Sequence, residues 1–126
     1  MIRLTDVSKH AGATCVLDRV DLHVTEGSFV ALLGPSGSGK TTLLRIVAGL
    51  DHPDSGALQL AGQPALRVPP GKRGLGFVFQ NYALFEHMTV AGNIAFGLEV
   101  RRPRPARQQV AATVERMLAL VRLEGL

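Results

Sequence analysis

The clearest chemistry in the sequence belongs to a glycine-rich segment that we call the phosphate loop. The pattern G-x-x-x-x-G-K-[ST] is matched by Gly34-Pro35-Ser36-Gly37-Ser38-Gly39-Lys40-Thr41. Glycines let successive backbone N–H groups turn toward one point, and such a nest binds anions. A lysine adds a positive charge, and a threonine hydroxyl is an oxygen ligand of the kind that Mg²⁺ prefers. The loop therefore predicts binding of a nucleotide polyphosphate tail together with Mg²⁺.

Each residue of the loop has an expected role. The backbone from Gly34 to Gly39 surrounds the phosphates, and the ammonium of Lys40 reaches the β- and γ-phosphates. The hydroxyl of Thr41 ligates Mg²⁺, and Thr42 adds a phosphate contact. A helix that begins near Lys40 points the positive end of its dipole at the same anion. Residues 34–42 are thus the predicted cofactor-binding set.

The elements that must position the loop flank it directly. Residues 29–33 are apolar at every position, which predicts a strand covered on both faces, as in a parallel sheet. After the loop, apolar residues recur at helical spacing, and Gly49 is a plausible helix end. An apolar strand before the loop and a helix after it are the context in which this motif binds phosphate.

The rest of the chain alternates short strands, turns and two later helices. Alternation predicts half-buried strands near residues 2–7, 20–24 and 58–60, and an apolar run predicts another strand at 75–79. Four turn-forming residues between 62 and 74 argue against a regular element there. Thr89 is expected to cap a helix through Ile94, Phe96 and Leu98, and a further amphipathic helix spans 110–121.

Composition restricts the class of protein. With 46% hydrophobic and 19% charged residues, the chain of 126 residues is globular rather than disordered. Cys15 is the only cysteine, which is typical of a reducing compartment, and residues 1–10 have no apolar core of a secretory signal. The net charge of +4 permits nucleic-acid binding, but no recognition motif supports it. No apolar stretch is long enough for a membrane span.

A second motif narrows the choice among phosphate-loop proteins. Gly76-Phe77-Val78-Phe79-Gln80 ends an apolar run with a glutamine, and Asn81-Tyr82-Ala83-Leu84-Phe85 follows. With the phosphate loop, its helix to Leu50 and the run from His87 to Leu98, this segment resembles the ATP-binding subunits of ABC transporters. Within that family, the segment from Gln80 to Leu98 most resembles importers of sulfate and thiosulfate. ATPase subunits of molybdate, polyamine and sugar importers share much of it.

The resemblance implies an α/β fold of the P-loop NTPase type. Antiparallel N-terminal strands would be followed by the start of a parallel core sheet and by the first helix of a helical subdomain. Gln80 would contact Mg²⁺ and the attacking water, which gives Lys40 and Gln80 as catalytic residues. Residues 82–88 would meet a membrane permease subunit. The whole protein would form a homodimer on the cytoplasmic face of the cell membrane, served indirectly by a periplasmic solute-binding protein.

The sequence departs from the family in two places. Ala11 occupies the position where an aromatic ring usually stacks on adenine, and His10 beside it is at best a weak substitute. We therefore expect looser discrimination against GTP. The signature motif and the Walker B acidic residues do not occur before Leu126. We accordingly expect an incomplete domain: residues 1–100 form the N-terminal part of the ATPase core, and residues 101–126 begin the helical subdomain.

Two alternatives remain beside a transport ATPase. A nonhydrolytic nucleotide-binding or regulatory fragment would keep the phosphate loop without the missing acidic groups, and we expect weak ATP binding at most and no meaningful hydrolysis from these 126 residues. A phosphate-loop kinase or GTPase is disfavoured, because no Asn-Lys-x-Asp motif for reading a base is present and Gln80 lies in an ABC-like context.

Overall fold

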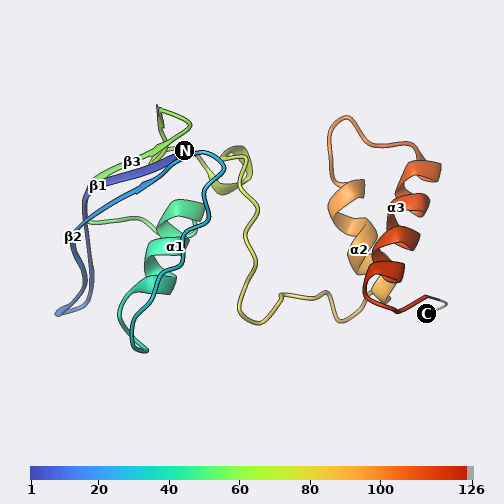
Figure 1. The fold of residues 1–126 in the computed structure, drawn as a ribbon, viewed down its shortest axis with the longest axis horizontal. Coiled ribbons are helices and arrows are strands. Elements are labelled where there is room, and N and C mark those ends of the chain that lie inside the picture. The colour runs from blue at the N-terminus through green and yellow to red at the C-terminus, as the bar shows by residue number, and fades with distance from the viewer. Residues whose placement is uncertain (125–126) are drawn as a thin grey trace. The chain divides into compact units, whose positions relative to one another are not determined.

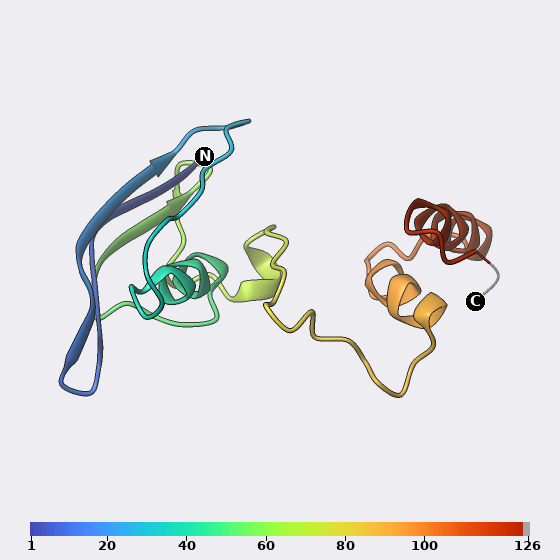
Figure 2. The same cartoon turned by 60° about the horizontal axis from the view of Figure 1, so that its bottom comes forward.

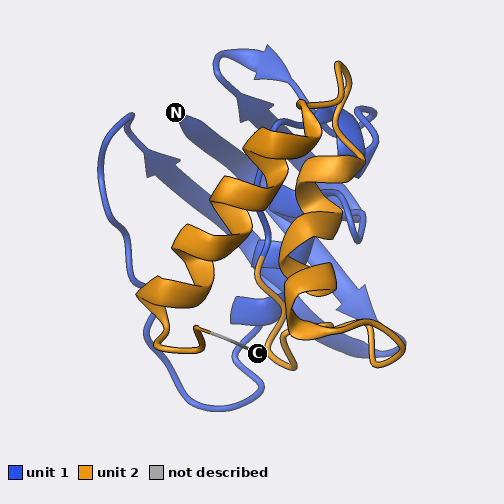
Figure 3. Ribbon diagram, turned by 90° about the vertical axis from the view of Figure 1, so that its right-hand side faces the viewer, with its two compact units in different colours: residues 1–77 blue, residues 78–126 orange. Residues whose placement is uncertain are grey.

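The computed structural model describes residues 1–124 and divides the chain into two compact units. The first unit is Met1–Phe77 and the second is Val78–Leu126 (Figure 3). Gly125 and Leu126, which end the predicted helical region, lie outside the described residues. The predicted boundary at residue 100 concerns the complete domain and stays a prediction.

A four-stranded antiparallel sheet forms one layer of the first unit. Its strands are β1 (Ile2–Ala11), β2 (Thr14–Val24), β3 (Ser55–Leu60) and the short β4 (Gln63–Pro64), in the order β2-β1-β3-β4. β1 pairs with β2 from Ile2↔Val24 to Ala11↔Thr14, with bulges between Leu4 and His10. The three strands predicted from alternating residues near 2–7, 20–24 and 58–60 are therefore confirmed.

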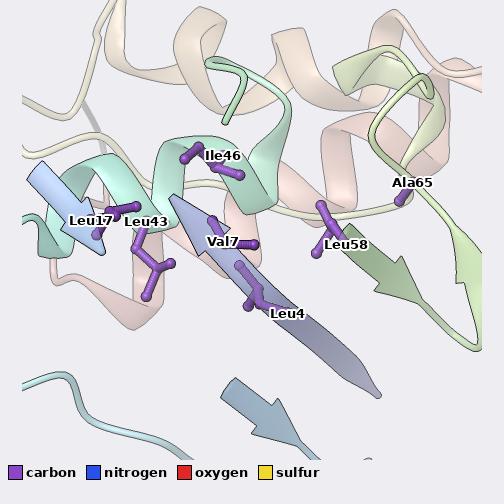
Figure 4. Packing of buried hydrophobic residues seen from close by; sticks show 7 residues of the cluster. All are labelled: Leu4, Val7, Leu17, Leu43, Ile46, Leu58 and Ala65. Carbon is purple, nitrogen blue, oxygen red and sulfur yellow. The ribbon is translucent and has the colours of Figure 1, made fainter. Parts of the chain in front are cut away.

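Helix α1 (Lys40–Ala48) lies against this sheet and closes the core (Figures 1 and 2). Figure 4 shows the buried cluster, in which side chains of β1, β2 and β3 meet Leu43 and Ile46 of α1. Its seven members are Leu4, Val7, Leu17, Leu43, Ile46, Leu58 and Ala65. Burial of these apolar groups holds the helix, and with it the end of the phosphate loop, on the sheet.

The prediction of strands at residues 29–33 and 75–79 is wrong, because the structure has no strand in either segment. Phe29 and Leu33 are 95% and 91% exposed, so the expected coverage on both faces is also wrong. A strand is defined by the hydrogen-bond ladder to a neighbour. Within residues 1–124 all strand pairing is antiparallel and confined to β1–β4, and neither apolar run is part of these ladders.

Two helices make up the second unit, as the sequence predicts. They are α2 (Val90–Glu99) and α3 (Arg107–Leu120), which pack against each other. Thr89 caps α2, because its side-chain oxygen accepts a hydrogen bond from the Gly92 N–H at 3.0 Å. The turn between the helices carries exposed arginines, of which Arg104 pairs with Glu99 at 3.2 Å. In residues 1–124, none of the helices is both long and apolar enough to cross a bilayer.

Candidate functional site

The phosphate loop presses against strand β2 at its last glycine. Gly39 is buried, has φ 84° and ψ 0°, and precedes the first residue of α1. A Cβ at this position would lie 2.6 Å from the carbonyl oxygen of Val16 and 2.8 Å from Cδ2 of Leu17. Both the left-handed backbone and the close approach of β2 therefore require glycine here. The sheet thus fixes the point at which the loop becomes helix.

The side chain of Lys40 folds back into the phosphate loop. Its ammonium donates hydrogen bonds to the carbonyl oxygens of Gly34 at 2.8 Å and Pro35 at 2.6 Å. It also donates to Oγ of Ser38 at 3.1 Å. Three donors are all that an ammonium has, and here the start and the end of the loop share them. The positive charge accordingly lies inside the loop rather than in open solvent.

The N-terminal end of α1 is electrostatically prepared for an anion. The first N–H groups of an α-helix have no acceptor within the helix, and the dipole leaves that end positive. The first turn of α1 holds no acidic side chain, and Gly39 supplies no side-chain cap. Thr41 is exposed and Thr42 half-buried in the same turn. Predicted residues 34–42 are thus gathered around one helix end.

A hollow of about 390 Å³ adjoins the loop on the side of β2. Its walls are mostly apolar and come from β2, from residues 31–33, from the phosphate loop and from α1, and Lys40 is one of the lining residues. Such a wall suits hydrocarbon better than phosphate, so the anion is expected on the N–H side of the loop instead. The phosphate loop forms one wall of this hollow.

Gln80 lies in the second unit, in an exposed turn. Tyr82 and Ala83, which follow after Asn81, have φ of 58° and 49°, which few non-glycine residues adopt. The structure therefore brings residues 34–42 together in the first unit and places Gln80 in a tight turn of the other. Among residues 1–124, no three His, Cys, Asp or Glu side chains converge on a common point.

The segment after Gln80 is fastened by Asn93 of α2, which the sequence analysis missed. Nδ2 of Asn93 donates to the carbonyl oxygens of Phe85 at 3.1 Å and Thr89 at 3.1 Å. Oδ1 accepts from the N–H of Phe85 at 2.8 Å. The ring of Phe85 also packs on that of Phe96, with centroids 4.5 Å apart. The loop that was predicted to meet a membrane subunit is thereby held in one shape at its C-terminal half.

The end of β1 is tied to the loop after α1 rather than open toward the phosphate loop. Nδ1 of His10 lies 3.0 Å from Oδ2 of Asp54, whereas Ala11 is exposed at the hairpin. Lys9 donates to Oδ1 of Asp51 at 3.0 Å. The Lys9 hydrogen bond is the main cause that lowers the pKa of Asp51, and the backbone N–H of His10 is the main cause that lowers that of Asp54.

Arg73 is the second residue that the sequence analysis missed. Its side chain is buried at 8% exposure and donates hydrogen bonds to four carbonyl oxygens, two of them at the end of α1. Arg73 stands among prolines and glycines, in a segment where turns were predicted. The sequence around Arg73 has no periodic pattern that would predict its burial. The one available signal is its position just before the apolar residues 75–79.

Comparison with known proteins places this geometry in a family. The profile of the ABC transporter family matches residues 17–126. The sulfate/thiosulfate import ATP-binding protein CysA of Caulobacter vibrioides is 52% identical over 99% of the chain, and that of Synechococcus elongatus is 54% identical over 99%. The chain spans 38% and 36% of the length of these relatives.

Solved structures agree with the sequence relatives. A dimeric ATP-binding cassette in a post-hydrolysis state, bound to ADP and Pi, matches with a TM-score of 0.84 at 29% identity. The match covers 99% of this chain and 59% of that one. The predicted α/β P-loop NTPase class, incomplete in extent, is therefore confirmed. Since the family profile covers most of the sequence, the protein belongs to the ABC transporter family.

Proposed function

We propose that this protein is the ATP-binding subunit of an ABC importer, in which ATP binding and hydrolysis drive uptake of sulfate or thiosulfate. The single observation that carries the ATP-binding role is the position of Lys40. Its ammonium lies within a loop of backbone groups, at the N-terminal end of a helix whose first turn has no acidic residue. Such a site is complementary to a polyphosphate. The solute rests on kinship with relatives that are named for sulfate and thiosulfate import.

In this proposal each predicted residue keeps its role. Backbone N–H groups of Gly34, Pro35, Ser36, Gly37, Ser38 and Gly39 surround the phosphates, Lys40 contacts the β- and γ-phosphates, and Thr42 adds a contact. Thr41 and Gln80 would hold Mg²⁺. Both offer neutral oxygens, which fit an ion that draws its remaining ligands from phosphate and water. Mg²⁺ supplies charge neutralisation at the transferred phosphoryl group.

The proposed partners follow from the same resemblance to ABC importers. Residues 82–88, whose C-terminal half Asn93 holds in place, form the surface for a membrane permease subunit. The whole protein forms a homodimer, is peripheral on the cytoplasmic face of the cell membrane, and depends indirectly on a periplasmic solute-binding protein. Residues 1–100 belong to the ATPase core, and residues 101–126 begin the helical subdomain. The dimeric state of the similar solved cassette supports the homodimer.

Binding of a fluorescent ATP analogue tests the proposed role. We expect K40A to lose about tenfold or more in affinity, because it removes a charge-assisted contact to phosphate. K72A is the matched control, since it removes an exposed lysine of the same unit outside the loop. Equal affinity of K40A and the unsubstituted protein would refute phosphate binding by the loop.

Three further readouts refine the function. Competition by GTP should be within about threefold of that by ATP, because Ala11 offers no stacking surface and His10 is turned to Asp54. A strong preference for ATP would contradict this. Phosphate release above the K40A level separates a transport ATPase from a nonhydrolytic nucleotide-binding protein. Restored growth of a sulfate-uptake mutant on sulfate, with no effect on growth on cysteine, tests the solute.

A further inference from the structure

The C-terminal end of α1 is held by a buried guanidinium. Nη1 of Arg73 donates to the carbonyl oxygens of Ile46 at 2.7 Å and Val47 at 2.8 Å. Nε donates to Val68 at 2.8 Å, and Nη2 to Leu66 at 3.4 Å. One side chain therefore joins the last turn of α1 to the segment of residues 66–73.

This contact completes the cap of the helix. The last carbonyl groups of an α-helix have no donor within the helix. The N–H groups of Gly49 and Leu50 bond to Ile46 and Arg45, and Arg73 adds donors to Ile46 and Val47. Gly49 makes room for it, because a Cβ there would lie 2.6 Å from Nε of Arg73. Gly49 thus both ends the helix and leaves the space that the guanidinium of Arg73 occupies.

The guanidinium is charged although it is buried. Burial lowers the pKa of Arg73, but arginine starts so high that it stays protonated at neutral pH. Within residues 1–124, no carboxylate pairs with it. The negative end of the α1 dipole takes the place of a counterion. The charge therefore stabilises the position of the helix end that is seen in the structure. This stabilisation would be lost if the helix end moved away from the guanidinium.

We propose that Arg73 is a positioning residue for phosphate binding, which fixes α1 from its C-terminal end and so places Lys40 and Thr41 at the other end. The inference rests on the proposed binding of ATP by the phosphate loop. Helix α1 has nine residues and its buried face packs on the sheet, so it moves as one rigid piece. Displacement at the Arg73 end is therefore passed to the residues that meet the nucleotide.

The test uses the R73K variant across pH 7.5–9.5, with R67K as the matched control. Arg67 is exposed in the same segment, so R67K makes the same chemical change outside the buried site. The ammonium of R73K keeps the charge but cannot make the forked contacts, and a buried ammonium titrates in a range where arginine does not. We expect R73K to bind ATP about threefold to tenfold more weakly at pH 7.5. This deficit, taken relative to the unsubstituted protein, should grow as pH rises.

A second measurement does not depend on a variant that folds. If the two ends of α1 are coupled, ATP must in return stabilise the Arg73 end. Hydrogen exchange of the Gly49 and Leu50 amides in the unsubstituted protein should slow when ATP is added. Protection confined to the loop amides would overturn the inference, as would R73K binding like R67K at every pH. Failure of the unsubstituted protein to bind ATP would instead refute the proposed function.

Discussion

The side-chain amide of Asn93 binds both backbone groups of Phe85. The Phe85 N–H donates to Oδ1 at 2.8 Å, and Nδ2 donates to the Phe85 carbonyl at 3.1 Å. A neighbouring strand would also offer one acceptor and one donor to the backbone of Phe85. The side chain of Asn93 therefore makes the two hydrogen bonds that strand pairing would otherwise make. The consequence is that a surface loop keeps a defined shape without belonging to a sheet.

Substitution of Asn93 should therefore release the loop before it affects the helices. We expect N93A to destabilise the loop by about 1–3 kcal/mol, because it leaves several backbone groups without a side-chain partner. The measurement is hydrogen exchange at the Phe85 amide, which should become faster. N81A is the matched control, since Asn81 is exposed in the same loop. An unchanged exchange rate in N93A would show that ring packing of Phe85 on Phe96 suffices.

Two glycines of the phosphate loop, Gly37 and Gly39, have nearly the same left-handed φ, so their substitution separates backbone strain from steric collision. Gly37 and Gly39 have φ of 81° and 84°, but only a Cβ at residue 39 would meet other atoms within 4 Å. We expect G37A to cost about 1 kcal/mol of stability from backbone strain. G39A should cost about 2–4 kcal/mol, because it also forces β2 away from the loop. Urea unfolding of both variants measures the difference, and equal costs would contradict the close approach of Val16.

The acidic residues after α1 predict a loss of stability in acid. The pKa values of Asp51 and Asp54 are lowered in the folded protein, chiefly by hydrogen bonds from Lys9 and from the His10 N–H. A lowered pKa means that the stabilisation is present above the unfolded value of about 4 and disappears as pH falls through the folded values.

Urea midpoints between pH 5 and pH 2.5 measure this effect. The unsubstituted protein should lose stability across the window, and D51N/D54N should be less stable at pH 5 but vary less with pH. D18N is the control, because Asp18 is exposed on β2 and its carboxylate lies 3.4 Å from the guanidinium of its neighbour Arg19. If D51N/D54N kept the full pH dependence, other carboxyl groups would be responsible for it.

Much of the structure could be predicted because its signals are local. Helix α1 was predicted from apolar spacing and from Gly49, and α2 from the capping residue Thr89. Both signals act within a few residues, and the structure confirms both. The hairpin of β1 and β2 is local in the same sense, since a tight turn joins strands that alternate in polarity.

The failures share a different physical cause. Residues 29–33 and 75–79 have the composition of strands, but a ladder needs a neighbour that composition does not reveal. Arg73 and Asn93 were missed for a related reason. Both side chains act by donating hydrogen bonds to backbone carbonyl groups, and Arg73 reaches carbonyls of α1 that are 26 and 27 residues away in the sequence. Because every residue type has a backbone carbonyl, the sequence does not indicate which residues accept these bonds. The position of Gln80 relative to Lys40 likewise stays a prediction.

The contacts of Lys40 determine what the proposed nucleotide binding would require of this loop. Because the ammonium already donates to Gly34, Pro35 and Ser38, an arriving phosphate oxygen trades places with a carbonyl or hydroxyl oxygen. The loop is consequently held together by the same cation that the proposed ligand needs. Binding of an anion would then exchange one set of hydrogen-bond acceptors of the Lys40 ammonium for another. Only an anion that also accepts hydrogen bonds from several backbone N–H groups would gain enough binding free energy to displace the carbonyl and hydroxyl oxygens.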